Sequence, residues 1–292
     1  MKVTSHSEYL KLKSVYIKTV QSAFISKDQI NEQWQELNYL DHPDLEMALQ
    51  EYKLFERILD DAKIELKYFP KNEKVKIDSI YCRDASIVTD FGMIICNMGK
   101  EGRIDEPKSH LEEYKQNKIP ILGIIEAPGT LEGGDVAWLD EKTLAVGYSY
   151  RTNEAGISQL KSILEPKGVE VIIAELPHYK GKTDVFHLMS ILSPVDKDLA
   201  VVYSPLMPIK FRNELLKRGF KLVEVPEEEF ESMGCNVLAI APRDCVMVEG
   251  NKITKKLLEA AGCKVTTYKG QEISVKGGGG PTCLTRPLLR VL

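Results

Sequence analysis

A cysteine that follows four consecutive glycines is the residue of this sequence with the clearest chemical potential. Cys283 comes after the glycine run 277–280 and two further residues, Pro281 and Thr282. Consecutive glycines give up side-chain packing, so they are expected where the chain takes unusual dihedrals or another group approaches the backbone. Backbone N–H groups at such a bend would lower the pKa of a nearby thiol. Cys283 is therefore a candidate nucleophile, and an inert cysteine in a flexible tail is the alternative.

A nucleophilic cysteine needs a partner that handles protons, and histidine is the usual one. The chain has five histidines. His6 lies in a polar terminus, His178 in a polar loop, and His42 and His110 beside expected helix starts, where we expect them to face solvent. His187 differs because it lies within an otherwise apolar run. It is the candidate acid and base, and a buried structural histidine is the alternative.

Carboxylates with unusual neighbours are the third group of candidate site residues. Glu132 and Asp135 flank a glycine pair just before an expected strand at 136–139, so a substrate could lie against the backbone there and face both acids. Arg83 and Asp84 lie between two apolar β-like runs, where a charged pair must find partners. The alternatives are a solvated turn for the first pair of acids and a satisfied ion pair for the second.

The elements that must position these residues alternate along the chain. Apolar and β-branched alternation predicts the strands, and three-and-four apolar spacing with glycine stops predicts the helices. The pattern repeats as strand, strand, helix, strand in about five copies, and it predicts one closed α/β body. The expected strands are 14–17, 64–68, 77–82, 93–98, 119–126, 136–139, 143–149, 169–176, 199–203, 221–225, 236–241, 246–248 and 264–268, and the expected helices are 43–59, 108–117, 153–164, 209–218 and 252–261.

Composition narrows the class of protein. The 292 residues carry a net charge of -4, without a basic stripe, so a nucleic-acid partner is not expected. The amino terminus lacks the apolar core of a signal peptide, and no apolar run is long enough for a membrane span, which favours a cytoplasmic protein with no membrane partner. The six cysteines show no CxxC spacing, so we expect reduced and mostly structural thiols and no metal site.

Six motifs, taken in order and with their approximate spacing, resemble the guanidine-modifying enzymes, a superfamily that includes dimethylarginine dimethylaminohydrolase, arginine deiminase and the amidinotransferases. The resemblance covers residues 77–285, and it implies the pentein fold, a five-bladed α/β propeller of ββαβ units with pseudo-fivefold symmetry, as a single catalytic domain over residues 1–292. The motifs are Arg83-Asp84, Glu132-Gly133-Gly134-Asp135, Gly147 to Asn153, Phe186-His187-Leu188, Gly234-Cys235-Asn236-Val237 and Gly278 to Thr285.

The resemblance also implies roles for individual residues. Cys283 would attack the central carbon of a guanidinium, and His187 would protonate the departing amine and later activate water against a thiouronium intermediate. Glu132 and Asp84 would grip the guanidinium nitrogens, with Asp135 as a further substrate-binding acid. The substrate carboxylate would be bound by Arg151 and Arg103. A cation held between carboxylates is well oriented and favours thiolate over thiol, so the scheme needs no metal or other cofactor.

The sequence does not decide between the activities found in the superfamily. Met189 follows Leu188 where arginine deiminases carry an acid, and 292 residues leave no room for the deiminase helical insertion, which favours a dimethylargininase that releases citrulline. The form Gly-Gly-Gly-x-x-Cys is closer to deiminases and amidinotransferases, so the guanidino substrate and the choice between hydrolysis and transfer stay open.

Functions of another kind also stay open. A pentein that only binds a ligand and a Cys-His peptidase are the alternatives; the joint presence of the thiol, the imidazole and the acids argues against the first, and the paired acids argue against the second. A homodimer is one option for assembly. The polar segment after the first strand could cap the site.

Overall fold

Five small sheets build the protein, and each belongs to one ββαβ unit. The computed structural model describes residues 3–184 and 186–291. Within each unit the first two strands pair antiparallel, and the third returns through a helix to pair parallel with the second. This organisation confirms the predicted repeat and its five copies.

Four of the units follow one another along the chain. They are β4 (Ser86–Thr89), β5 (Gly92–Ile95), α4 (Glu106–Gln116) and β6 (Ile121–Ile124); β7 (Val136–Asp140), β8 (Thr143–Tyr148), α5 (Glu154–Leu164) and β9 (Glu170–Glu175); β10 (Leu192–Asp196), β11 (Leu199–Val202), α6 (Ile209–Lys217) and β12 (Lys221–Glu224); and β13 (Leu238–Ala241), β14 (Asp244–Val248), α8 (Lys252–Ala260) and β15 (Lys264–Tyr268).

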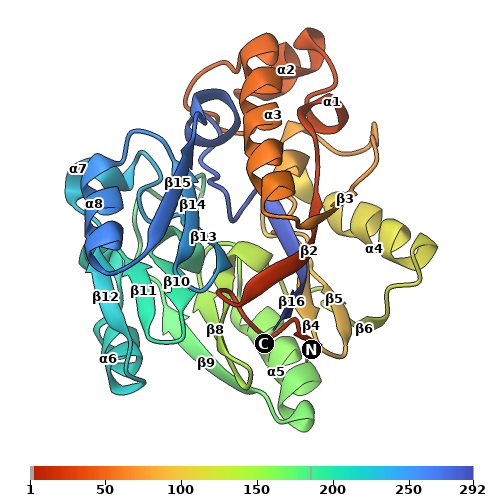
Figure 1. Ribbon diagram of the computed structural model, residues 1–292. Coiled ribbons are helices and arrows are strands. Elements are labelled where there is room, and N and C mark those ends of the chain that lie inside the picture. The colour runs from red at the N-terminus through yellow and green to blue at the C-terminus, as the bar shows by residue number, and fades with distance from the viewer. Residues whose placement is uncertain (1–2, 185, 292) are drawn as a thin grey trace.

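The fifth unit joins the two ends of the chain. The carboxyl-terminal strand β16 (Thr285–Val291) pairs with β2 (Lys11–Ile17), which continues through α3 (Leu45–Asp61) to β3 (Glu65–Tyr68). The short β1 (Val3–Thr4) adds to the other edge of β16, so the termini lie side by side (Figure 1). Cys283 stands two residues before β16, and this closure therefore fixes its place in the molecule.

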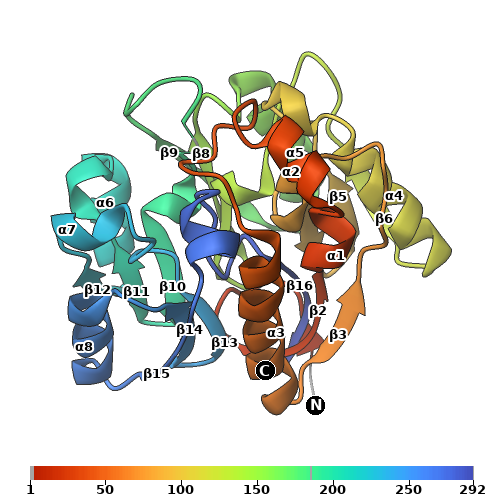
Figure 2. The ribbon, with the colours of Figure 1, turned by 90° about the horizontal axis from the view of Figure 1, so that it is seen from above.

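The helices lie outside and the first strands of the units lie inside. Helices α3, α4, α5, α6 and α8 surround the strands in both views (Figures 1 and 2). First strands of neighbouring units pack on one another, as β7 does on β10 and β10 on β13, while β16 packs on β4. Apolar residues from several units form shared cores between strands and helices. The loops before the first strands are thereby brought together at one end of this inner layer.

Local sequence explains why the helices begin and face as they do. Asp44 caps α3 by accepting a hydrogen bond from the Met47 N–H (2.8 Å), and the stripe through Tyr52, Phe55 and Leu59 is buried. In α5, Asn153 is the N-cap and accepts from the Gly156 N–H (2.8 Å). The predicted apolar faces of these helices are the faces that pack.

The segment between β2 and α3 contributes to the site. It contains α1 (Val20–Ala23) and α2 (Lys27–Gln33), followed by a turn whose residues Leu37, Asn38 and Leu40 line the main cavity. This segment therefore supplies part of the cavity wall through these three residues, and its role as a cap stays a prediction.

Three expectations about local structure were wrong. The predicted strand at 77–82 is a 3₁₀ helix over Ile77–Ile80, and all four of its residues are buried. The sequence analysis also missed β10 and β16. His110, expected at the surface, is buried and stacks on Phe69 with ring centroids 3.9 Å apart.

The remaining short helix is α7 (Glu227–Phe230), which lies between the third and fourth units. Among the described residues, no helix combines the length and the apolar character required to cross a bilayer.

Candidate active site

The cavity that contains the candidate residues has a volume of about 290 Å³ and is lined by segments that lie far apart in the sequence, from Leu37 to Cys283. Cys283, His187 and Asp84 all contribute to its wall, although they come from loops that precede three different units. Three of the consecutive glycines, Gly277–Gly279, also line it. The convergence of these segments is the feature on which the chemistry depends.

The glycine run makes room for two side chains that pack against the cysteine loop. A Cβ at Gly279 would lie 2.4 Å from ring carbons of Tyr81, and a Cβ at Gly280 would lie 2.5 Å from the carboxamide of Asn236. Gly278 takes a positive φ of 73°, which favours glycine. Both predicted reasons for the glycines, unusual dihedrals and close approach, thus apply.

Cys283 is the partly exposed cysteine, whereas the other five free cysteines are buried. Its N–H donates to the Gly280 carbonyl (3.0 Å), and the N–H of Thr282 donates to Oδ1 of Asn236 (3.0 Å), so neither is free for the sulfur. Burial raises the pKa of the Cys283 thiol, and the nearby Asp84 carboxylate adds to this rise. The expectation that local backbone N–H groups would lower this pKa was wrong because those groups are already bonded.

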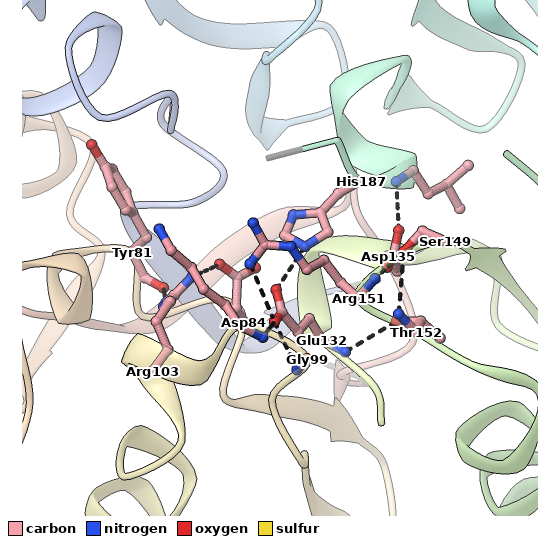
Figure 3. Close-up of polar contacts among 12 residues, drawn as sticks. Tyr81, Asp84, Gly99, Arg103, Glu132, Asp135, Ser149, Arg151, Thr152 and His187 are labelled. Atoms are coloured by element: carbon pink, nitrogen blue, oxygen red, sulfur yellow. Dashed lines mark hydrogen bonds and ion pairs between the residues drawn. The ribbon is translucent and has the colours of Figure 1, made fainter. Parts of the chain in front are cut away.

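His187 is buried and bonded to Glu132. Its Nε2 donates to Oε2 of Glu132 (2.8 Å), and the two side chains point toward each other in Figure 3. Burial alone would lower the pKa of His187, but Asp135, the bond to Glu132 and the charge of Asp84 outweigh it and raise this pKa to about 9. The imidazole is therefore protonated at neutral pH and can act as an acid.

Glu132 is a fully buried carboxylate held by several donors. Its Oε1 accepts from the N–H groups of Gly99 and Lys100 (both 2.9 Å), and Nη1 of Arg151 lies 3.7 Å away. Burial by itself would raise the pKa of Glu132, but the hydrogen bond and charge of His187 hold it well below its usual value. Glu132 is thus an anion that stabilises the protonated imidazole.

Asp84 presents an unsatisfied acceptor. Its Oδ2 is bonded by Nη1 of Arg103, whereas Oδ1 is buried and has no hydrogen-bond partner among the described residues. A Cβ at Gly134 would lie 2.4 Å from Nδ1 of His187 and 2.7 Å from this Oδ1, so the glycine allows the two side chains to meet. A buried acceptor without a donor is costly in the free protein and suits a ligand that brings N–H groups.

Asp135 lies behind His187. Its Oδ2 accepts from Ser149 Oγ (2.6 Å) and its Oδ1 from the Leu188 N–H (2.9 Å), as Figure 3 shows. Asp135 is absent from the residues that line the cavity, which differs from the expectation that it faces the substrate. The described contacts make it an anchor for the segment that carries His187.

The two predicted arginines differ in how many donors remain free. Arg103 lines the cavity, but Asp84, Glu106 and the Tyr81 carbonyl occupy four of its five N–H groups. Arg151 donates through Nη2 to the carbonyl of Asp184 (3.2 Å). Its Nε and Nη1 make no hydrogen bond with the described residues, although they are buried.

The sequence analysis missed Asp78 and Lys100, two charged residues of the cavity wall. Nζ of Lys100 lies 2.6 Å from Oδ2 of Asp78 and donates to the Leu37 carbonyl (2.7 Å). Asp78 was hidden in a stretch expected to be a strand, and nothing in the local pattern marked Lys100. The tertiary structure brings them together.

The donor set could in principle hold a metal ion. Ligand atoms of Asp84, Glu132 and His187 lie within 4.8 Å of one another. A metal-binding imidazole must be neutral, whereas the surrounding carboxylates raise the pKa of His187 and favour its protonated form. Two carboxylates, a buried acceptor and an acidic imidazole fit an organic cation with N–H donors better.

The fold and this site define a pentein in whose cavity a thiol, an imidazole and the Asp84 carboxylate meet, with Glu132 fully buried outside the cavity wall and bonded to the imidazole. The eukaryotic N,N dimethylarginine dimethylhydrolase family model matches residues 19–290, and the chain belongs to this family.

Similar curated proteins cover different shares of their own lengths. The N(G),N(G)-dimethylarginine dimethylaminohydrolase of Pseudomonas aeruginosa is 28% identical over 249 residues, which are 85% of this chain and 91% of that protein. An arginine deiminase of Listeria welshimeri is 27% identical over 252 residues, covering 72% of this chain. The chain matches only 61% of that deiminase's length.

Solved structures agree on the fold. The Pseudomonas aeruginosa dimethylarginine dimethylaminohydrolase in complex with citrulline has a TM-score of 0.77 at 24% identity, and it covers 95% of this chain and 100% of its own. An amidinotransferase of Microseira wollei has a TM-score of 0.79 at 17% identity, with coverage of 99% and 97%. These likenesses establish the pentein fold that the sequence motifs implied.

Proposed function

We propose that this protein is an amidine hydrolase that cleaves a C–N bond of methylated arginine or arginine and yields citrulline plus an amine or ammonia. The observation that carries the proposal is the cavity in which Cys283, His187 and Asp84 meet, with Glu132 bonded directly behind His187. The family of the chain and the names of its relatives support the same reaction.

Asp84 and Glu132 would bind the guanidinium. The free Oδ1 of Asp84 accepts an N–H of the substrate, and Glu132 contributes a second negative charge beside it. Holding the planar cation in this way presents its central carbon to Cys283, and positioning of this kind is worth up to about 7–11 kcal/mol in favourable cases. The bound cation also favours the thiolate, which offsets the raised pKa of Cys283.

The first half-reaction forms a covalent intermediate. The thiolate of Cys283 attacks the central carbon and forms a C–S bond, the C–N bond to the leaving nitrogen breaks, and protonated His187 gives its proton to that nitrogen. The raised pKa of His187 means that the proton is in place before the substrate arrives. A neutral amine or ammonia then departs, and a thiouronium remains on the enzyme.

The second half-reaction returns the enzyme to its starting state. The imidazole, now neutral, takes a proton from water as the water oxygen bonds to the central carbon. The C–S bond breaks and its electron pair returns to sulfur, while the hydroxyl of the adduct loses its proton to solvent, so that the neutral ureido product leaves. Glu132 stabilises the imidazolium that forms again.

Other charged groups in the cavity wall can bind the α-ammonium and the carboxylate of an amino acid substrate. Asp78 can bind an α-ammonium, and Lys100 beside it can bind a carboxylate. Arg103 and Arg151 are proposed for the same carboxylate. Arg103 lines the cavity, although four of its N–H groups are occupied. Arg151 has Nε and Nη1 without hydrogen bonds among the described residues, but it is not part of the cavity wall and its Nη1 lies 3.7 Å from Glu132.

Met189 supports a substituted guanidinium. It lines the cavity at the position after Leu188, together with Phe186 and Cys235, and so adds thioether and apolar surface instead of a third acid. A methylated guanidinium has fewer N–H donors and more apolar surface than arginine, so this wall suits it.

The test is a panel of guanidino compounds. We expect purified protein to form citrulline from at least one methylated arginine or from arginine, with methylamine, dimethylamine or ammonia released in equal amount. Absence of any ureido product across the panel would contradict the proposal. Added glycine as acceptor separates the alternative, because an amidinotransferase would make guanidinoacetate and ornithine.

Cys283→Ser is the matched variant for the nucleophile. We expect turnover to fall by at least about 10³-fold while circular dichroism and melting temperature stay close to wild type. Cys263→Ser, which alters a cysteine outside the cavity wall, is the control and should keep full activity. Undiminished activity of Cys283→Ser would remove the assignment.

The setting proposed for this reaction is one catalytic domain acting on free small molecules in the cytoplasm. The six cysteines are free thiols, as is usual for proteins in a reducing compartment.

A further inference from the structure

Asn236 lies directly beside the sulfur of Cys283, and no step of the proposed reaction uses it. It belongs to the segment just before β13, and its side chain lines the cavity. Its Nδ2 donates to Sγ of Cys283 at 3.3 Å. Among the sequence motifs, Gly234 to Val237 was noted only for its resemblance.

The orientation of the Asn236 carboxamide follows from its other partners. The N–H of Thr282 can only donate, and it reaches one side of the amide at 3.0 Å. That side must therefore be Oδ1, which leaves the NH₂ group facing the sulfur. Gly280 allows this contact, since a Cβ there would lie 2.5 Å from Cγ and Oδ1 of the amide.

Thr282 does not replace Asn236 as a donor. Its Oγ1 lies 3.9 Å from the sulfur, but the single hydroxyl proton already goes to Oδ1 of Asn236 (2.9 Å). The Cys283 N–H is bonded to Gly280, as described above. The amide of Asn236 is thus the near donor that the described residues offer to the sulfur.

The backbone on both sides of Asn236 is held in place. Oγ of the buried Ser193 donates to the Cys235 carbonyl (2.7 Å) and accepts from the Val237 N–H (3.1 Å). The N–H of Asn236 donates to the Met233 carbonyl (3.0 Å). The amide donor is therefore oriented before any substrate binds.

We propose that Asn236 is a catalytic residue that stabilises the Cys283 thiolate through its Nδ2 donor, both before attack on the guanidinium and when the thiolate leaves the intermediate. The inference rests on Cys283 as the proposed nucleophile. An amide suits this position because it is neutral. A cationic side chain would stabilise the thiolate too, but it would repel the cationic substrate that Asp84 and Glu132 attract.

Asn236→Leu separates this role from a structural one when it is compared with Thr282→Val. Leucine has nearly the shape of asparagine and is neutral, but it lacks the N–H donor to the sulfur. Both variants break the hydrogen bond between the Thr282 hydroxyl and the Asn236 side chain, so a role in fixing the loop alone predicts equal effects. If Asn236 stabilises the thiolate, the pKa of the thiol should rise by about one unit or more in Asn236→Leu.

The measurement is the pH dependence of iodoacetamide alkylation of the free protein, followed by intact mass and peptide mapping, with Cys283→Ser as blank. We expect the midpoint for Cys283 to move to higher pH in Asn236→Leu and in Asn236→Ala, the second variant if the first does not fold. Thr282→Val, the control, should shift it far less. A wild-type profile in the asparagine variants, or an equal shift in Thr282→Val, overturns the proposal.

Alkylation needs no substrate, so this result is independent of the hydrolase assignment. If the midpoint shifts in the variants but the protein forms no ureido product, the role of Asn236 stands and the proposed reaction is rejected. If the protein forms a ureido product but the midpoint does not shift, the reaction stands and the role of Asn236 is rejected.

Discussion

Oε2 of Glu132 lies 2.8 Å from Nε2 of His187, although 55 positions separate the two residues in the chain. Each stands before the first strand of a unit, Glu132 before β7 and His187 before β10, and these strands pack on each other. The pair therefore exists because two neighbouring units present their leading loops at the same end. It keeps an acid charged and an imidazole protonated inside the protein.

We expect His187→Ala to slow product formation and to leave a covalent adduct on Cys283. Without the imidazole no group activates water, so the thiouronium is hydrolysed slowly. Intact mass after addition of substrate should show the protein plus the substrate less the departed amine or ammonia. The double variant Cys283→Ser/His187→Ala should show no added mass, and an adduct that persists there would contradict the mechanism.

The pH profile of kcat/KM should rise up to about pH 9 and fall at higher pH. Burial raises the thiol pKa of Cys283 above its ordinary value and the pKa of His187 is about 9, so His187 sets the lower limit of the profile and the thiol sets the upper one. In Asp135→Asn the charge that raises the His187 pKa is lost, so the rising limb should move about one unit to lower pH and the maximum should fall. An exposed control, Asp61→Asn, should leave the profile unchanged; an unmoved limb in Asp135→Asn would count against this electrostatic role.

Glu132→Gln should destabilise the protein by about 3–5 kcal/mol at pH 7, since it leaves a buried imidazolium without its anion. The folded-state pKa of His187 is raised above its unfolded value of 6.5, so the stabilisation is complete below pH 6.5 and disappears as pH rises through about 9. The difference from wild type should therefore shrink between pH 7 and pH 10.

Urea unfolding at the two pH values measures this difference. Glu36→Gln, which removes an exposed partner of Lys76, is the control and should change stability by less than about 1 kcal/mol. Equal stability of Glu132→Gln and wild type at pH 7 would show that the pair contributes nothing net.

Met189→Asp should shift preference toward unsubstituted arginine. The new carboxylate would add an acceptor for N–H groups that a methylated guanidinium lacks, at some cost in stability from burial of the charge. The ratio of kcat/KM for arginine to that for dimethylarginine is the measurement, and we expect a rise of about tenfold. Met189→Leu keeps the apolar wall and should keep the ratio; a fall in the ratio for Met189→Asp would refute this account of selectivity.

Much of the fold was predictable because periodicity is local. The helix α5 and the strands β13 and β14 were expected from residues a few positions apart, and all three are present. The prediction of a strand over Ile77–Ile80 was wrong for the same reason, because a short, mostly apolar run suits a buried 3₁₀ turn as well as a buried strand. The strand β16 was missed because its pairing with β2 joins opposite ends of the chain.

The sequence alone determined the candidates Cys283, His187, Glu132 and Asp84, because residue types and their neighbours are visible in one dimension: glycines beside Cys283 and Glu132, and apolar runs around His187 and Asp84. Tertiary structure decided their roles. It put Asp135 behind His187, used most of the donors of Arg103 inside the protein, and added Asp78, Lys100 and Asn236 to the cavity wall. The reason is physical: hydrogen bonds and charge effects act over a few ångströms in space, and the distances that govern them arise only when units far apart in the chain pack together.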